Sequence, residues 1–252
     1  MIARNPSSIL HKLGLEFFSH KLASKSWFSQ IRDICLLYQL PHPLSFMLNH
    51  QTKESFKSAV KKKVISYWEA KLRLEASGLT SLKYFHPENM SLSSPHPLWL
   101  TASSPYEVSK ATVQAQMLSG RYRTELLCSH WSTNTNGWCL TPSCMGLDVK
   151  EDLEHILVYC PSLAITWKTL LNFTLKYARA NPILYPILSV YCNPRHPQFC
   201  QFLLDCTCFA DVIAISSLYG STLLNKLLYI GRTWCYSLHR NRARLLDRWE
   251  FS

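Results

Sequence analysis

Four side chains that bind soft metals lie close together in the sequence, in two pairs with equal internal spacing. Cys139 and Cys144 are separated by four residues, ten more residues follow, and His155 and Cys160 are again separated by four, giving C-x4-C-x10-H-x4-C. Three thiolates and one imidazole are the ligands that a tetrahedral structural zinc takes. Each residue alone is better explained as an ordinary buried thiol or histidine. Four at these spacings favour a zinc site, although the first spacing lies at the edge of the usual range.

A short helix is predicted to carry the second pair of ligands. Asp148 followed three places later by Glu151 is typical of a helix start, so a helix should begin near residue 149 and run to about 159. His155 should project from a face that neighbours the apolar one. The apolar residues recur at helical spacing and should face a core: Leu153, Ile156 and Leu157.

Pro161 is predicted to bring Cys160 back toward His155. On a continuous helix the two ligands would lie about 140° apart, too far to share a metal. The residue before a proline is pushed out of helical geometry. The chain should therefore leave the helix at Cys160, which can then fold back and complete the site.

Other cysteines and histidines form no comparable pattern. Cys128 and His130 lie near the cluster and are spare ligands, since they lack a second pair at the right spacing. A second metal site farther along the chain is conceivable, but its spacings match no known pattern, and buried thiols are the better interpretation. The residues concerned are Cys192, His196, Cys200, Cys206 and Cys208.

Two groups of basic residues are candidate contacts to nucleic acid. Arg121, Tyr122 and Arg123 place two guanidinium groups beside an aromatic ring that could bind phosphate and stack on an unpaired base. A more frequent outcome for such a tripeptide is pairing with acidic neighbours and packing. The second group follows one face of a predicted helix, where a phosphate-contacting surface and a solvated surface are equally good explanations. It consists of Lys57, Lys61, Lys62 and Lys63.

Composition and apolar periodicity predict a mostly α protein. The chain has 252 residues, 47% of them hydrophobic, with seven glycines, so it can bury a core with few tight turns. Helical bundle-like modules with a small zinc-stapled segment are expected. The predicted divisions are a helical region with a basic helix at 1–83, a linker at 84–104, the zinc-binding module at 105–180 and a helical region with a basic end at 181–252.

Several helices have recognisable ends. Pro41 and Pro43 should end a helix over 24–40, and Gly78 should close a basic helix that begins near Thr52. Ser104, with Pro105 and Glu107 after it, is a nearly complete helix start, and that helix should stop at Gly120. Further helices are expected from about residue 163 and over 222–248. The last helix ends in four arginines, which could interact favourably with the helix dipole or contact nucleic acid: Arg240, Arg242, Arg244 and Arg248.

Charge and hydropathy bound the partners and the compartment. The net charge is +11 and the pI about 9.2, which favours an acidic partner such as RNA or DNA. The chain opens without the pattern of a secretory signal, and charges interrupt its most apolar stretch. We therefore expect a nuclear or cytoplasmic protein with reduced thiols, without a membrane span or a small-molecule substrate.

The sequence resembles a known family over most of its length, from about Lys12 to Trp249. The segments that carry the likeness are MLSGRYRTELLCSHW, the Cys/Cys pair, DLEHILVYCP and RTWCYSLHRNRARLL. They are similar to the region downstream of the polymerase in reverse transcriptases of non-LTR (LINE-type) retrotransposons. The resemblance implies a largely helical fold, with Cys139, Cys144, His155 and Cys160 as zinc ligands and a role in holding template RNA or target DNA. It transfers no catalytic residue, because the polymerase palm lies upstream of the matched region.

One short run imitates a catalytic motif. Phe209, Ala210 and Asp211 are like the reverse-transcriptase metal motif, but Val212 stands where a second aspartate is needed. Asp211 is therefore expected to be a helix cap or a surface residue. The expected function is a non-catalytic, zinc-binding and nucleic-acid-binding fragment of a retrotransposon reverse transcriptase.

Two alternatives remain open at the level of the sequence. One is a helical protein-interaction module that uses stripes around Trp27, Trp68 and Trp234, with a purely architectural zinc. The other is a decayed element fragment without a selected function.

Overall fold

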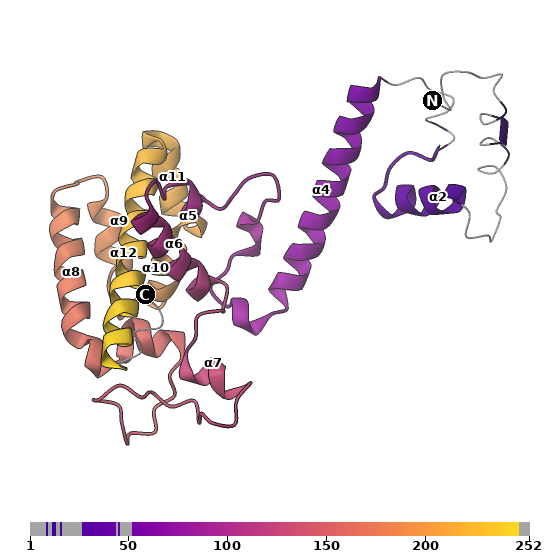
Figure 1. The fold of residues 1–252 in the computed structure, drawn as a ribbon. Helices are drawn as coiled ribbons and strands as arrows, with labels where there is room; N and C mark the ends of the chain where they lie inside the picture. The colour runs from indigo at the N-terminus through magenta and orange to yellow at the C-terminus, as the bar shows by residue number, and fades with distance from the viewer. Residues whose placement is uncertain are drawn as a thin grey trace. The chain divides into compact units, whose positions relative to one another are not determined.

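The computed structural model describes residues 27–43, 45 and 52–246, together with the isolated positions 9, 12, 13 and 16. Within these residues the chain is mostly α, which confirms the predicted fold class. Their β pairing consists of an isolated antiparallel bridge between Trp138 and Lys150. The chain divides into two compact units, residues 1–74 and 75–252 (Figure 1).

The first unit contains α2 (Trp27–Leu37) and most of α4 (Lys53–Ser77), which continues into the second unit. Tyr38 and Tyr67 meet edge to face, with ring centroids 5.1 Å apart. The helix predicted over 24–40 is present from Trp27 onward, and residues 24–26 lie outside the described part. Thr52 accepts a hydrogen bond from the Ser55 amide through its hydroxyl, so the basic helix starts where its sequence indicates.

The second unit is built around α12 (Ser221–Leu245), drawn in yellow in Figure 1. This helix packs against α6 (Pro105–Leu118), α8 (Ala164–Arg179), α10 (Phe199–Leu204) and α11 (Ala210–Tyr219). The remaining helices are short: α5 (Pro97–Leu100), α7 (Glu125–Ser129) and α9 (Tyr185–Tyr191).

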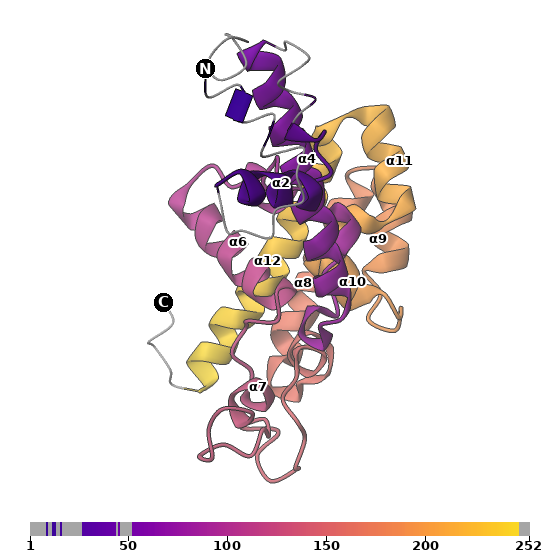
Figure 2. The same ribbon diagram turned by 90° about the vertical axis from the view of Figure 1, so that its right-hand side faces the viewer.

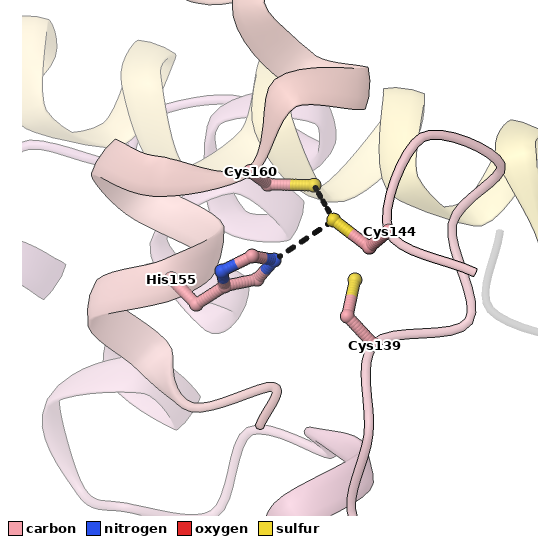
Figure 3. Close-up of side chains that lie close together, drawn as sticks. All are labelled: Cys139, Cys144, His155 and Cys160. Atoms are coloured by element: carbon pink, nitrogen blue, oxygen red, sulfur yellow. Dashed lines mark hydrogen bonds between the residues drawn. The ribbon is translucent and has the colours of Figure 1, made fainter. Parts of the chain in front are cut away.

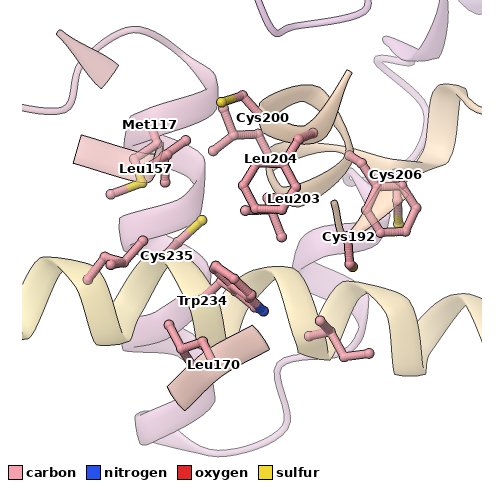
Figure 4. Packing of buried hydrophobic residues seen from close by; sticks show 14 of the residues in the cluster. Met117, Leu157, Leu170, Cys192, Cys200, Leu203, Leu204, Cys206, Trp234 and Cys235 are labelled. Atoms are coloured by element: carbon pink, nitrogen blue, oxygen red, sulfur yellow. The ribbon is translucent and has the colours of Figure 1, made fainter. Parts of the chain in front are cut away.

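Trp234 lies at the centre of this core and is completely buried (Figure 4). Its indole nitrogen donates a hydrogen bond of 2.9 Å to the Thr174 hydroxyl on α8, and its ring meets Phe199 of α10 edge to face. Full burial of a ring this large, with its N–H satisfied, is a major source of stability. Trp234 therefore cannot belong to the protein-interaction surface that was considered for Trp27, Trp68 and Trp234.

A glycine allows α10 and α12 to approach closely. A Cβ atom added to Gly231 would lie 2.4 Å from the Leu203 carbonyl oxygen, a distance that side-chain atoms do not tolerate. The carbonyls of Leu203 and Leu204 accept hydrogen bonds of 2.8 and 2.9 Å from the Gln114 side chain on α6. One polar side chain of α6 thus satisfies the carbonyls at the end of α10 in the core.

The predicted start and end of α6 are confirmed. The Ser104 hydroxyl accepts a hydrogen bond from the Glu107 amide, Pro105 is the first helical residue, and α6 ends at Leu118. Gly120 has a φ of +66°, a conformation that favours glycine after a helix end.

The proline and serine content of the segment 84–104 suggested a linker between two parts of the chain. In the structure this segment lies within the second unit. It contains a 3-10 turn (Pro87–Asn89) and α5, and Leu98 is 1% exposed. Three long-range polar contacts hold it. The Tyr84 carbonyl accepts from the Gln201 side chain, Asn89 donates to the Thr207 hydroxyl, and His96 lies 3.6 Å from Asp205. Polar residues therefore anchor the segment where apolar periodicity is weak.

Candidate metal centre and basic surface

Residues 121–163 form the end of the second unit that carries α7 and the surrounding loops (Figure 2). The isolated bridge places Trp138 opposite Lys150, the Cys139 amide donates to the Val149 carbonyl, and the Glu151 amide donates to the Gly137 carbonyl. A tight turn then brings Cys144 back toward Cys139, with the Cys144 amide bonded to the Thr141 carbonyl. This ribbon positions the first pair of ligands.

The helix that carries the second pair differs from the predicted one. It begins at Leu153 and not near residue 149, because Asp152 is the capping residue: its carboxylate accepts from the His155 amide at 2.7 Å. Asp148 has a φ of +50° and forms part of a turn before the helix. Glu151, which was expected to cap the helix, is completely buried and binds other partners. The predicted burial of Ile156 and Leu157 is confirmed.

A π-helical turn over His155–Tyr159 explains how ligands five residues apart share one site. The Cys160 amide donates to the His155 carbonyl at 2.7 Å, so a single turn closes over five residues. Residues separated by five therefore return to the same face, whereas on an α-helix they would diverge. Cys160 itself has a ψ of 112°, which confirms that the chain leaves the helix before Pro161.

The four predicted ligands come together in one buried group (Figure 3). Their ligand atoms all lie within 4.8 Å of one another. The Cys144 sulfur is 3.4 Å from Nε2 of His155 and 4.0 Å from the Cys160 sulfur. A tetrahedral zinc would require roughly 3.6 Å between N and S and 3.8 Å between two S atoms. The two distances lie about 0.2 Å from these values, and because the widest separation is within 4.8 Å, the cluster could hold a metal ion after shifts of at most about 1 Å.

In the metal-free cluster, contacts among the four side chains shift their pKa values in different directions. A hydrogen bond with Cys160, together with burial, raises the pKa of Cys139 to about 12, and burial raises the pKa of Cys144. The same hydrogen bond from Cys139 lowers the pKa of Cys160 to about 7. The pKa of His155 is raised, first by its hydrogen bond with Cys139. Cys139 and Cys144 therefore hold a proton at neutral pH that a metal would displace.

Thr141 is a supporting residue that the sequence did not reveal. It is completely buried, and its hydroxyl lies 3.1 Å from the Cys139 sulfur and 3.3 Å from the Cys160 sulfur. A hydroxyl in this position can donate a hydrogen bond to a thiolate and so favour the charged form that binds a metal. Its position two residues after a ligand was the available signal.

Residues 137–160, which carry the four candidate ligands, are called the metal segment below. A buried ion pair joins this segment to α12. Arg242 is 7% exposed and binds the Glu151 carboxylate through Nε, at 3.1 Å, and through Nη2. Glu151 also accepts the Glu125 amide at 2.9 Å, and one of its oxygens lies 3.6 Å from the Cys139 sulfur. Burial, the largest single influence, lowers the pKa of Arg242, but the hydrogen bonds with Glu151 and the nearby charges of Glu151 and Glu125 together raise it, so the guanidinium stays charged.

The Arg121–Tyr122–Arg123 group is split between surface and core. Arg121 and Arg123 are exposed, whereas Tyr122 is 6% exposed. The Tyr122 hydroxyl lies 3.1 Å from Nδ1 of His239, and burial raises the pKa of Tyr122 to about 12. The predicted stacking of this ring on an unpaired base is therefore incompatible with its buried position. The two arginines remain candidates for phosphate contacts.

The four lysines predicted to contact nucleic acid, Lys57, Lys61, Lys62 and Lys63, are all exposed on α4. The arginines at the basic end of α12 differ from one another. Arg240 and Arg244 are exposed and Arg242 is buried, while Arg248 lies outside the described residues. A run of arginines in the sequence therefore contains one structural residue.

The remaining thiols behave as buried apolar groups. All ten cysteines are free, and Cys192, Cys200 and Cys206 are at most 8% exposed in the helical core (Figure 4). Burial raises the pKa of Cys192 and of Cys200 to about 12, so both stay protonated. Within the described residues no second group of potential metal ligands forms, and Cys128 and His130 lie outside the cluster.

Asp211 is an exposed residue in the first turn of α11, where its carboxylate accepts a hydrogen bond of 3.0 Å from the Tyr191 hydroxyl. Val212 beside it is 1% exposed. The expectation of a surface residue is confirmed, whereas Phe209 and not Asp211 occupies the helix cap.

None of the helices in the described residues combines the length and the apolar character of a membrane span. No protein-family model, no curated protein and no solved structure shows significant similarity to this chain.

Proposed function

We propose that this chain is a non-catalytic module that binds zinc and nucleic acid, derived from the post-polymerase region of a non-LTR retrotransposon reverse transcriptase. The observation that carries the proposal is the buried group formed by Cys139, Cys144, His155 and Cys160. The other support is chemical: the net charge, and the exposed basic side chains on α4 and beside the metal segment.

Zinc is the metal that best suits the cluster. Sulfur and imidazole ligands in tetrahedral arrangement favour zinc over calcium or magnesium, which require oxygen ligands. The protein supplies all four ligands, and each is at most 6% exposed. A catalytic zinc keeps one position for water or substrate. The ion would therefore act structurally, by fixing the ribbon at 137–151 to the π-helical turn.

Nucleic acid is the partner that the charge distribution favours. Lys57, Lys61, Lys62 and Lys63 are solvent-exposed on α4, and Arg121 and Arg123 are exposed in the second unit. Contacts of this kind to phosphate groups are independent of base sequence. Binding to RNA or DNA without a strong sequence code is the expected behaviour.

The salt dependence of binding tests this proposal. The zinc-loaded full chain is titrated into a labelled single-stranded RNA and into the matching DNA, across roughly 50 to 200 mM salt. Each phosphate contact releases counterions and contributes about −0.7 to the slope of log K against log salt for a single strand. We expect a linear decrease, with a shallower slope in a Lys57→Gln/Lys61→Gln variant. Absence of binding, or binding indifferent to salt, contradicts the proposal.

A protein-interaction module is the second candidate, because the first unit exposes large apolar side chains. Trp27 is 56%, Ile34 50% and Trp68 38% exposed. Exposed apolar residues that gather in one region are typical of protein interfaces. An apolar interface is nearly indifferent to ionic strength, so the salt titration separates the two functions.

A further inference from the structure

A pocket of about 390 Å³ lies beside the metal segment, within the second unit. Residues 80–84 form one side, the end of α6 and α7 form another, and residues 152–154 of the metal segment form the third. Met117, which is 1% exposed, and Leu153 are among its apolar walls. A cavity of about 150 Å³ in another protein holds benzene, and small-molecule sites begin at about 300 Å³. The pocket can therefore hold a two-ring group the size of a purine base.

Contacts within the fold hold the sides of the pocket together. Gly120, just after α6, lies directly against Ser81: a Cβ atom added to Gly120 would be 2.1 Å from the Ser81 carbonyl oxygen. On the opposite side, the Leu126 amide of α7 donates a hydrogen bond of 3.2 Å to the Glu151 carbonyl of the metal segment. The pocket is thus part of the packed second unit and forms without a ligand.

The lining contains two carboxylates that differ in their availability. Glu154 accepts hydrogen bonds from Lys83 and, at 2.6 Å, from the Tyr84 hydroxyl, so its charge is offset. Asp152 accepts the His155 amide at 2.7 Å through Oδ1. This bond fixes the carboxylate, and its second oxygen accepts no hydrogen bond from the described residues. The pocket therefore offers a held acceptor to N–H donors and repels phosphate groups.

A buried hydroxyl in the lining supplies the complementary donor. Thr124 is 6% exposed, and its oxygen accepts the Leu127 amide at 3.1 Å. The hydroxyl proton has no acceptor among the described residues, so it can be donated to a ligand in the pocket. Buried polar groups are normally hydrogen-bonded, which makes a ligand oxygen at this position favourable.

Guanine is the base whose edge suits these groups. Its Watson–Crick edge presents two adjacent N–H donors, which one carboxylate can accept in parallel, and a carbonyl oxygen next to them. Uracil presents one N–H between two carbonyl oxygens that a carboxylate repels. A basic side chain of a protein partner would also suit Asp152. The net charge of +11 disfavours such a partner and attracts a polyanion.

We propose that this pocket binds one unpaired guanine base of a nucleic-acid strand, with Asp152 accepting from its N–H groups and Thr124 donating to its carbonyl oxygen. The inference rests on the proposed function and adds to it a base preference at a single position. The phosphates of the strand remain outside the pocket, where their contacts stay independent of base sequence.

A matched pair of variants tests the assignment in the zinc-loaded full chain. Asp152→Asn keeps an oxygen for the His155 amide and replaces the free acceptor oxygen with an NH₂ donor. Asp148→Asn removes the same charge at an exposed position of the metal segment that does not line the pocket. Affinities are measured at one salt concentration for a short all-uridine RNA and for the same strand with one central guanosine. A short arginine peptide is titrated as a rival ligand.

The wild type and Asp148→Asn should bind the guanosine strand at least about fivefold more tightly than the all-uridine strand, the discrimination expected of one specific base contact. Asp152→Asn should bind the two strands equally. The two strands carry the same number of phosphates, so the ratio of affinities reports on the base alone. Both variants should melt near the wild-type temperature, because asparagine caps a helix as well as aspartate does.

Three results would overturn the guanine pocket and leave the proposed function intact. They are equal binding of both strands by the wild type, a preference that survives in Asp152→Asn, and a preference that Asp148→Asn also loses. Binding of the arginine peptide that Asp152→Asn abolishes, without any base preference in the wild type, would assign the pocket to a protein partner instead. A wild-type chain that binds neither strand overturns both proposals.

Discussion

At the scale of the residue, the metal cluster depends on side chains that must lose protons to act. The raised pKa of Cys139 and that of Cys144 mean that both thiols are protonated at neutral pH in the metal-free protein. Thr141 and the Glu151–Arg242 pair surround the sulfurs with fixed polar groups. Metal binding is thus an exchange of protons for an ion in a closed, prearranged site.

Zinc binding should release at least two protons at pH 7. Cys139 and Cys144 lose theirs completely, and Cys160, whose pKa is lowered to about 7, loses part of one. Because the free cluster holds the protons, acidification stabilises the metal-free form and zinc affinity falls as the pH falls. Calorimetry in two buffers with different ionisation enthalpies measures the number released. Identical heats in both buffers would contradict the protonation assigned to the free cluster.

Sequence spacing identified the four residues of the cluster, because metal coordination restricts both residue type and separation. It did not identify their support. Thr141 lies two residues after Cys139, but a single hydroxyl at that spacing was too common a pattern to single it out. Arg242 and Glu151 are 91 positions apart, and a pairing over that distance depends on how α12 packs and leaves no local pattern.

At the scale of the element, the π-helical turn and the end of α12 are the two devices that build the site. A turn closed over five residues brings His155 and Cys160 to one face. Its start could not be predicted, since Asp148, Glu151 and Asp152 can all cap a helix and the choice depends on tertiary contacts: Glu151 is withdrawn into the ion pair, which leaves Asp152 as the cap.

Replacing Arg242 should destabilise the second unit much more than replacing its neighbour on the same helix. An Arg242→Ala change leaves the Glu151 and Glu125 carboxylates without their counter-charge in a buried site, at a cost of about 3–5 kcal/mol. Arg244 is exposed, so Arg244→Ala should cost less than about 1 kcal/mol. Urea unfolding of the zinc-loaded variants measures both free energies. Similar values for the two would show that the buried pair does not hold α12 to the metal segment.

At the scale of the whole molecule, composition and periodicity predicted a mostly α chain and located α4, α6 and α12 closely. The division of the chain into two units was harder to predict from the sequence. Proline and serine at 84–104 suggested a linker, yet Leu98 is buried and Tyr84, Asn89 and His96 contact residues more than a hundred positions later. Single anchoring residues of this kind carry no periodic signal, so composition describes such a segment as a connection.

We propose that the whole chain holds one structural zinc through this cluster. A structural site of this type contributes on the order of 10 kcal/mol of binding free energy, comparable to the stability of a domain. Losing one ligand should therefore release the metal and lower the melting temperature of the protein. Cys128 offers a matched control, because it lies on α7 outside the cluster.

The most direct test is the metal content of the purified full chain, determined by mass spectrometry for the wild type and for Cys144→Ser and Cys128→Ser variants, with a melting curve for each. We predict one zinc per chain in the wild type and in Cys128→Ser, and loss of zinc with a lower melting temperature in Cys144→Ser. A Cys144→Ser protein that keeps stoichiometric zinc and melts like the wild type would contradict the account.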